Sequence, residues 1–183
     1  MELKINTKHI LKVLHALSWI IFIGICIEAG AIIGNAILTL AFPAGARHFW
    51  REVDLLALYG YDPGYFFVQA LLIGIVAVMK ACIFYLIVKM LHNKKLNMSR
   101  PFNPEMGRFM FSVSYLSLGI GLFSWWGVKY AAWLTEQGVE MPDVQHLRLG
   151  GADVWLFMGV TLFVVALIFK RGIEIQTENE LTV

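Results

Sequence analysis

The sequence predicts an all-α membrane protein in which four transmembrane helices form an antiparallel bundle with both termini in the cytoplasm. Three observations lead to this fold class. Hydrophobic residues make up 58% of the chain, only 15% of the residues are charged, and four long apolar runs alternate with connections of different charge. The segments between the apolar runs are too short for a separate soluble domain. We therefore expect residues 1–183 to form a single membrane domain.

Each helix is predicted from an apolar run long enough to cross a bilayer, which takes about 20 residues. Asp62 before Pro63 and Asn103 before Pro104 each provide an N-cap acceptor followed by a proline, which suits the first turn of a helix. Pro43 ends the first helical region. The predicted helices span about residues 13–42, 63–91, 104–135 and 152–171.

The distribution of Lys and Arg predicts the orientation. Basic residues precede the first run, fill the connection between the second and third runs, and follow the fourth run. Fewer lie in the other two connections, where Arg47, Arg51 and Arg148 occur. By the positive-inside rule, both termini and the middle connection face the cytoplasm. The expected location is the cytoplasmic (inner) membrane of a bacterium, with the lipid bilayer as the first partner.

The connection between the first two helices is predicted to contain a short amphipathic helix over residues 46–59. Phe49, Val53 and Leu56 fall at helical spacing on one stripe, with charged residues away from it. Such a helix is expected to lie on the outer membrane face.

An acid lies near the middle of the first apolar run, and a base lies near the middle of the second. At about 1.5 Å per helical residue, Glu28 is roughly 16 Å from Leu17 and Lys80 is roughly 14 Å from Lys89 at the same membrane side. A carboxylate at the bilayer centre costs about 3 kcal/mol or more unless it is paired or neutralised. We therefore predict an intramembrane pair of Glu28 and Lys80. Two interpretations stay open, a structural ion pair that fixes helix register and a proton- or ligand-responsive site.

Four further polar residues are predicted to support this pair. Ser117 and Thr161 are each nine positions from a basic residue at the cytoplasmic side, which gives them a similar depth. Asn35 shares a helix face with Glu28, and Gln69 shares one with Lys80. The predicted midplane belt therefore adds Asn35, Gln69, Ser117 and Thr161 to the pair.

Small residues predict where helices approach closely. Gly30 and Gly34 form a GxxxG spacing in the first helix, and Ser117, Gly121 and Ser124 form a stripe on the third. We interpret both as packing faces within the chain, with association between copies as the alternative. An oligomer is therefore possible on sequence grounds.

The sequence shows no pattern for a cofactor, a metal or a catalytic site. The only cysteines, Cys26 and Cys82, are isolated in different helices. The histidines show no ligand spacing within the bundle, and GxSxG, HExxH and phosphate-binding glycine loops are missing. We assign no enzymatic activity, cofactor or metal, although haem or quinone association stays open as a functional class.

The predicted cytoplasmic face carries opposite charges. The basic middle connection would attract an acidic tail over residues 172–183, so the two are expected to dock as one platform, with a solvated tail as the alternative. A soluble partner would bind this platform. The residues predicted for the partner surface are Lys94, Lys95, Arg100, Arg108, Glu174, Glu178, Asn179 and Glu180.

Two segments near this face carry a family resemblance. They read SRPFNPEMGRF at residues 99–109 and FKRGIEIQTENELTV at residues 169–183. The whole chain resembles an uncharacterised bacterial family of small four-helix integral membrane proteins, classed only as a domain of unknown function. In similar proteins the gene often lies beside one for a small helix-turn-helix regulator, so the resemblance implies a cytoplasmic transcriptional regulator as partner. It implies no reaction and no catalytic residues.

Three functional classes follow from these patterns. The first is a sensor or regulatory membrane protein that acts through a cytoplasmic helix-turn-helix partner and does not itself bind nucleic acid. The second is a transporter of a small molecule or ion that uses Glu28 and Lys80. The third is a haem- or quinone-associated membrane protein.

Overall fold

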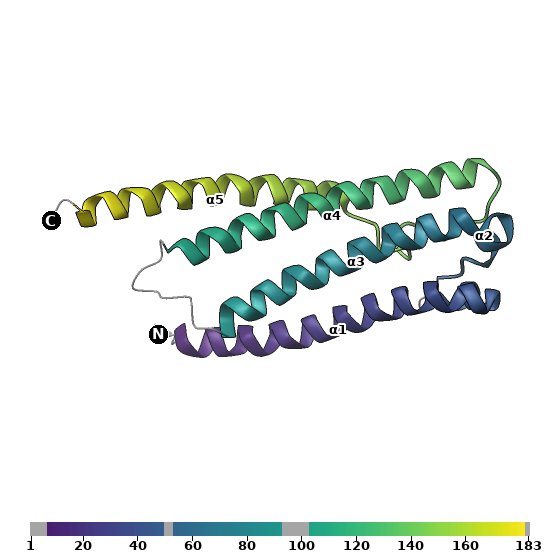
Figure 1. Cartoon of the computed structure of the whole chain (residues 1–183), viewed down its shortest axis with the longest axis horizontal. Helices are drawn as coiled ribbons and strands as arrows, with labels where there is room; N and C mark the ends of the chain where they lie inside the picture. Colours follow the sequence, from purple (N-terminus) through teal and green to yellow (C-terminus); the bar gives the residue numbers. More distant parts are fainter. Residues whose placement is uncertain (1–6, 50–52, 93–102, 182–183) are drawn as a thin grey trace, which may run out of the picture.

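A computed structural model of the chain describes residues 7–49, 53–92 and 103–181 (Figure 1). Within these ranges the elements are helical and no strand is present. Four helices are long and apolar enough to cross a membrane, as the sequence predicts for a multi-pass membrane protein. The elements are α1 (Thr7–Ala41), the 3₁₀ helix η1 (Pro43–His48), α2 (Leu56–Tyr61), α3 (Pro63–His92), α4 (Pro104–Glu136) and α5 (Ala152–Leu181).

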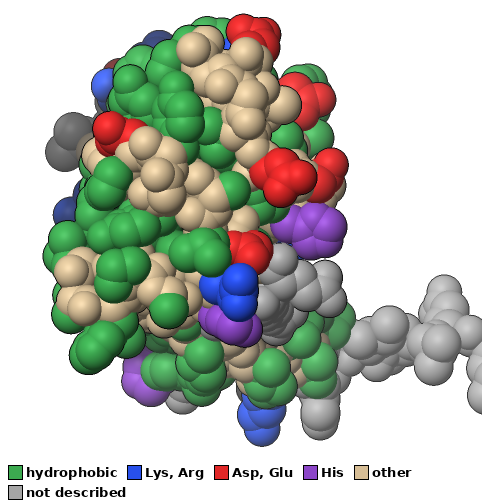
Figure 2. All heavy atoms as spheres, turned by 90° about the vertical axis from the view of Figure 1, so that its right-hand side faces the viewer, with side chains coloured by type: hydrophobic (Ala, Val, Ile, Leu, Met, Phe, Trp, Pro, Cys, Tyr) green, Lys and Arg blue, Asp and Glu red, His purple; other side chains and the backbone are tan. Residues whose placement is uncertain are grey.

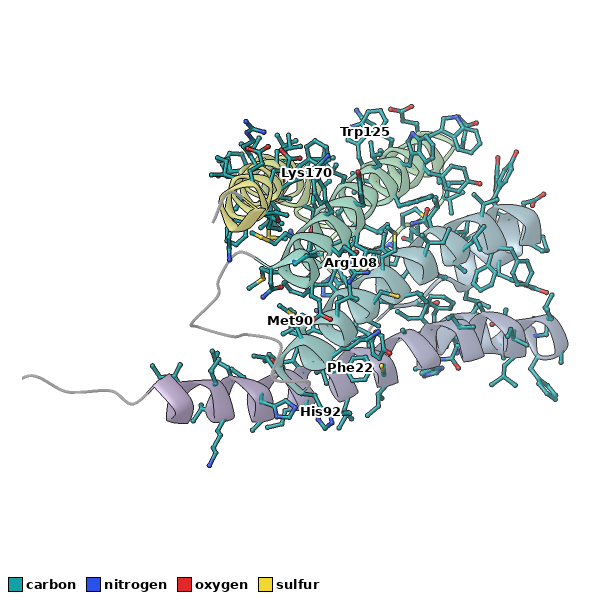
Figure 3. All side chains as sticks on the ribbon, turned by 60° about the vertical axis from the view of Figure 1, so that its left-hand side comes forward. Phe22, Met90, His92, Arg108, Trp125 and Lys170 are labelled. Carbon is teal, nitrogen blue, oxygen red and sulfur yellow. The ribbon has the colours of Figure 1, made fainter. Side chains whose placement is uncertain are left out.

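The four long helices lie in a row in chain order, with α1 and α5 at its edges (Figures 1 and 3). Each packs against the next one along the row, α1 on α3, α3 on α4 and α4 on α5. In the described part of the chain α1 and α5 make no contact, so the row is open and not a closed four-helix bundle. The helices alternate in direction, and α1 begins at the end where α5 ends. We call this the terminal end, and the end that holds η1, α2 and residues 137–143 the loop end; the rest of the connection to α5 runs back between the helices.

The connection from α1 to α3 differs from the continuous helix predicted over residues 46–59. Phe49 and residues 53–55, the described residues between η1 and α2, are non-helical, and the backbone N–H of Phe49 donates to the carbonyl of Val53 at 3.1 Å. The side chains of both residues are buried inside the protein. The apolar stripe therefore packs against the helices and not on the bilayer surface. Asp54 accepts a hydrogen bond from the N–H of Leu56 at 2.8 Å, a local turn just before α2, which begins as a separate helix at Leu56.

The remaining boundaries follow the predicted capping residues closely. Asn103 accepts a hydrogen bond from the N–H of Met106 at 2.7 Å at the start of α4, and Asp62 accepts one from Tyr65 at 3.1 Å at the start of α3. The larger differences are at the ends of the chain. α1 begins at Thr7, and α5 continues through most of the predicted tail, residues 172–183, to Leu181.

Small residues hold α4 and α5 together. The Ser114 hydroxyl donates to the carbonyl of Gly159 at 2.8 Å between the two helices, and a Cβ on Gly121 would lie 2.6 Å from the side chain of Leu156. The predicted small-residue stripe on α4 is therefore a packing face. Gly30 and Gly34 on α1 differ, because a Cβ there would meet no atom within 4 Å. Among the described residues, these two glycines therefore mediate no helix packing.

Candidate functional site

A cavity of about 280 Å³ lies among α1, α3, the start of α5 and the loop before it. It brings together both residues of the predicted pair, since Glu28 of α1 and Lys80 of α3 line it. Arg148 from the loop and Trp155 from α5 complete its polar and aromatic lining. Its remaining walls are aliphatic and consist of Ile25, Ile73, Val76 and Ala77.

The packing of α1 on α3 puts the acid and the base at the same depth. The rings of Phe22 in α1 and Tyr85 in α3 lie 6.1 Å apart and fix the register of these antiparallel helices. Glu28 lies six residues from Phe22 toward the loop end, and Lys80 lies five residues from Tyr85 in the same direction. At about 1.5 Å per residue, the two positions differ in depth by roughly 1.5 Å.

Arg148 joins the two charged residues of the helices. Its Nε atom lies 3.4 Å from Oε1 of Glu28 and forms an ion pair with it. Its backbone carbonyl accepts a hydrogen bond from Nζ of Lys80 at 3.1 Å. The predicted pair is thus part of a three-residue cluster, in which the ion pair of Glu28 is made with Arg148 and Lys80 binds the backbone of the same arginine.

Buried neighbours hold Arg148 in place. Leu147 and Leu149 on either side are 1% and 0% exposed, and a Cβ on Gly127 of α4 would lie 2.6 Å from the side chain of Leu149. Arg148 itself has a φ of 60°. This left-handed conformation costs an L-residue about 1–2 kcal/mol. The burial of the two leucines offsets that cost, so the loop is anchored while the arginine is presented to the cavity.

The charges of the cluster do not balance. Lys80 and Arg148 contribute two positive charges and Glu28 one negative charge, which leaves a formal charge of +1 among the described residues that line the cavity. Nζ of Lys80 also lies 5.9 Å from the ring centre of Trp155, a cation–π distance. The side chains of Arg148 and Glu28 are 45% and 26% exposed, so the ion pair can be reached from outside the protein.

The four predicted supporting residues lie away from this cavity. Asn35 donates to the carbonyl of Phe49 at 2.7 Å and so ties α1 to the connection after η1. Gln69 and Ser117 are fully buried, and their side-chain polar atoms have no hydrogen-bond partner among the described residues. Thr161 is exposed and donates to the carbonyl of Phe157 in its own helix. The structure therefore does not join the four residues to the charged pair in one belt.

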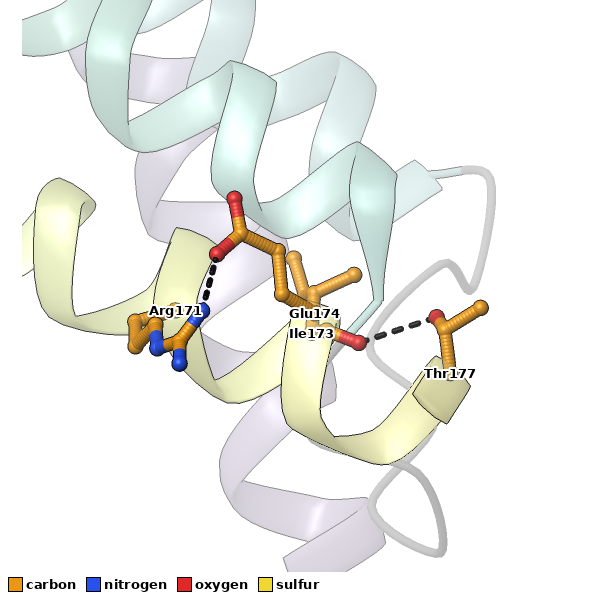
Figure 4. Close-up of polar contacts among 4 residues, drawn as sticks. All are labelled: Arg171, Ile173, Glu174 and Thr177. Atoms are coloured by element: carbon orange, nitrogen blue, oxygen red, sulfur yellow. Dashed lines mark hydrogen bonds and ion pairs between the residues drawn. The ribbon is translucent and has the colours of Figure 1, made fainter. Parts of the chain in front are cut away.

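Only part of the predicted partner surface is described, and that part lies at the terminal end. Lys94, Lys95 and Arg100 fall outside the described residues, as do the side chains of Asn179 and Glu180. Arg108 is exposed on α4, and Glu178 is exposed on α5. Glu174 forms an ion pair of 3.0 Å with Arg171 of its own helix (Figure 4). In the next turn, the Thr177 hydroxyl donates to the carbonyl of Ile173 at 2.9 Å. Docking of this segment on the basic connection remains a prediction.

The loop end carries an acidic surface (Figure 2). A hollow of about 720 Å³ is lined there by Asp54, Glu140, Asp143 and His146, together with apolar residues. At the terminal end, the rings of His15 and His92 are 5.7 Å apart. Within residues 7–49, 53–92 and 103–181, no group of three or more His, Cys, Asp or Glu side chains could hold a metal ion. Haem or quinone association remains a prediction that an absorption spectrum of the purified protein tests.

Sequence reasoning missed Arg148 as a site residue. It treated this arginine only as one of the few basic residues of the outer connections. The available signal was the segment Leu147–Arg148–Leu149 before Gly150 and Gly151, in which a lone charge stands between two leucines in a loop. Alternation of this kind indicates that the leucines are buried and that the charge points the other way.

No family model, curated protein or solved structure matches the chain. The function is therefore inferred from the contacts of the molecule itself. The charged cavity is the strongest candidate for a functional site, because an ionisable group inside a membrane is costly and is usually kept for a function. The cluster also lies next to a helix that reaches the opposite end of the protein.

Proposed function

We propose that the protein is a membrane sensor, a regulatory component that responds to a small molecule in the charged cavity and acts on a cytoplasmic partner through α5. The observation that carries this proposal is the double contact of Arg148, which lies four residues before α5. Its side chain pairs with Glu28 of α1 and its carbonyl binds Lys80 of α3. A ligand that competes for either contact changes what holds the start of α5.

The structure of α5 suits transmission over a long distance. The helix runs without interruption for 30 residues, which corresponds to about 45 Å. Its backbone packs on α4, and near its start Trp155 lies beside Lys80 of α3. Gly151 immediately before it has a φ of 77°, a conformation that L-residues rarely adopt. A rigid helix held on one side and preceded by a glycine can shift as a unit.

The partner half of the proposal rests on charge and on the family resemblance. The positive-inside rule favours placing the terminal end in the cytoplasm of a bacterial cell, with the protein in the inner membrane. A helix-turn-helix regulator is the partner that the resemblance implies. The proposed contact surface includes Arg108, Glu174 and Glu178, together with the basic residues of the middle connection.

Distance measurement by double electron–electron resonance tests the coupling without a ligand. Cys26 and Cys82 are replaced by Ala, and spin labels are placed at Lys89 of α3 and Thr177 of α5, both exposed near the terminal end. We expect Arg148→Gln to shift or broaden the distance distribution, because the loop before α5 loses its ion pair with Glu28 of α1. The matched change Arg47→Gln, at an exposed arginine of η1, leaves it unchanged. Identical distributions in all three proteins contradict the coupling.

Co-purification tests the partner. The resemblance implies a neighbouring gene for a helix-turn-helix regulator. This regulator is co-expressed with the full chain and, separately, with a chain that ends at Arg171. We expect the regulator to co-purify with the full chain and not with the shortened one. Equal recovery with both chains contradicts a role for the end of α5.

Transport is a second candidate function, favoured by the depth of the cavity. Glu28 and Lys80 lie near the middle of helices that are long enough to cross the membrane, where transporters place their substrate sites. Proteoliposomes separate the two functions. Proton-dependent solute flux that is lost in Lys80→Met supports transport, whereas a sensor changes the position of α5 without flux.

A further inference from the structure

We propose that the cavity among α1, α3 and α5 binds a small amphipathic monoanion, a molecule with one carboxylate on a compact apolar body. This inference rests on the proposed sensor function and names the class of ligand that the sensor detects. Charge, hydrogen-bond donors and cavity shape support it independently.

The charge of the lining favours one negative charge. Lys80 and Arg148 outnumber Glu28, which leaves a formal charge of +1 in a cavity at membrane depth. An uncompensated charge at that depth is costly, so a ligand with a single negative charge stabilises the site. A phosphate monoester carries about −1.5 to −2 at pH 7 and therefore over-compensates the site. A cationic ligand adds a third positive charge and is disfavoured.

The donors of Arg148 are available to such a ligand. Its ion pair with Glu28 joins the Nε atom to Oε1 at 3.4 Å, and among the described residues its guanidinium donates no hydrogen bond. A guanidinium presents parallel N–H groups that match the two oxygens of a carboxylate. The Arg148–Glu28 separation of 3.4 Å exceeds the 2.7–2.9 Å typical of a charge-assisted hydrogen bond. Glu28 is thus a loosely held competitor for the same donors.

The other walls suit an apolar body of limited size. Trp155 provides an aromatic face, and Ile25, Ile73 and Val76 provide aliphatic ones. The volume of about 280 Å³ lies just below the range of roughly 300–1,000 Å³ that accommodates drug-sized molecules. The ligand is therefore smaller than a drug-sized molecule. Lys80 has two N–H groups left after its bond to the carbonyl of Arg148 and contributes a second point of attraction for the carboxylate.

Calorimetric titration with three matched probes tests the ligand class. The protein is placed in nanodiscs of phosphatidylcholine, which has no net charge, and empty nanodiscs provide the background for partition into lipid. Hexanoate, hexanol and hexylamine share one apolar body and differ in the head group. We expect saturable binding of hexanoate alone. The proposal is overturned if hexanoate does not bind, or if hexylamine or hexanol binds as well as it does.

Charge-removing variants assign the binding to this cavity. We expect Lys80→Met and Arg148→Gln each to weaken hexanoate binding about tenfold, which corresponds to about 1.4 kcal/mol. Glu28→Gln strengthens binding, because it removes the competing carboxylate. This gain of affinity cannot arise from misfolding. Lys129→Met, at an exposed lysine of α4, serves as the matched control and leaves affinity unchanged. Unchanged affinity in Lys80→Met, or weaker binding in Glu28→Gln, contradicts the assignment.

The two proposals fail separately. The distance measurement on Arg148→Gln uses no ligand, so it can succeed while hexanoate fails to bind, which removes only the ligand class. If hexanoate binds as expected and α5 does not move in Arg148→Gln, the cavity is a monoanion site and the proposed sensor coupling is removed.

Discussion

The two edge helices of the row are held in different ways. α5 lies against α4 through close contacts of small residues, including the Ser114–Gly159 hydrogen bond of 2.8 Å. α1 packs on α3, but its own glycines, Gly30 and Gly34, face open space. α1 is instead tied to the loop end by polar contacts from Asn35 and Glu28. Close apolar packing fixes one edge, and polar links position the other.

This difference indicates which edge a ligand can affect. Interdigitated helices resist displacement relative to each other because their atoms have no space to move into, so a shift of α5 relative to α3 carries α4 with it. Polar links respond to a competing charge, since a ligand can take over the donor or the acceptor. We therefore expect packing changes to act mainly on α4 and α5, and charge changes to act on the relation of α1 to the loop before α5.

The largest effect is expected from adding a methyl group to the α4–α5 contact. A Cβ on Gly159 would lie 2.8 Å from the side chain and 2.9 Å from the backbone nitrogen of Leu118, so Gly159→Ala should lower the free energy of unfolding by about 2 kcal/mol through overpacking. Gly30→Ala should leave it unchanged or raise it by up to about 1 kcal/mol, because alanine favours a helix. Unfolding in detergent micelles measures both. A similar loss in both variants contradicts the contrast between the edges.

A smaller effect is expected at the polar link near the loop end. Asn35→Ala removes the donor to the carbonyl of Phe49, which is 2.7 Å away, and should cost about 1 kcal/mol. Hydrogen exchange should rise over residues 43–49 and not in α4 or α5. Uniformly raised exchange along the whole chain contradicts a local role for this bond.

The smallest change concerns the hydrogen bond between α4 and α5. Ser114→Ala should lower the free energy of unfolding by about 0.6 kcal/mol, the average for such bonds between membrane helices. Thr161→Ala removes a hydroxyl that bonds only to the carbonyl of Phe157 in its own helix and should have no measurable effect. An equal loss in both variants shows that the interhelical bond does not contribute.

Much of the fold could be predicted because it depends on local signals. Apolar length indicates each span, and Asn103 and Asp62 mark helix starts through hydrogen bonds to residues three positions later. The open row could not be predicted, because it depends on which faces meet. The two glycines of α1 have the spacing of a packing motif, yet no atom of the described residues would lie within 4 Å of a Cβ there.

The sequence predicts how deep in the membrane the candidate site lies, but not which residues form it. Depth follows from counting residues, so Glu28 and Lys80 meet at one cavity as the counting suggests. Thr161 was assigned a similar depth by the same counting, yet it is exposed, because depth does not determine which way a side chain faces. The alternation Leu147–Arg148–Leu149 indicates which way Arg148 points but not which residue it contacts. Its contact to Glu28 spans most of the chain and has no local signal.

Intramolecular crosslinking tests the central claim most directly, namely that Arg148 reaches α1 across the cavity. In a chain with Cys26 and Cys82 replaced by Ala, cysteines are placed at Glu28 and Arg148 and treated with a short bifunctional thiol reagent. We predict a crosslink within one chain for this pair. The control pair Glu28→Cys with Lys129→Cys should give none. Lys129 is an exposed residue of α4, and α4 makes no contact with α1 in the described part of the chain. Failure of the first pair to crosslink, or equal crosslinking of both, would contradict the contact on which the sensor proposal rests.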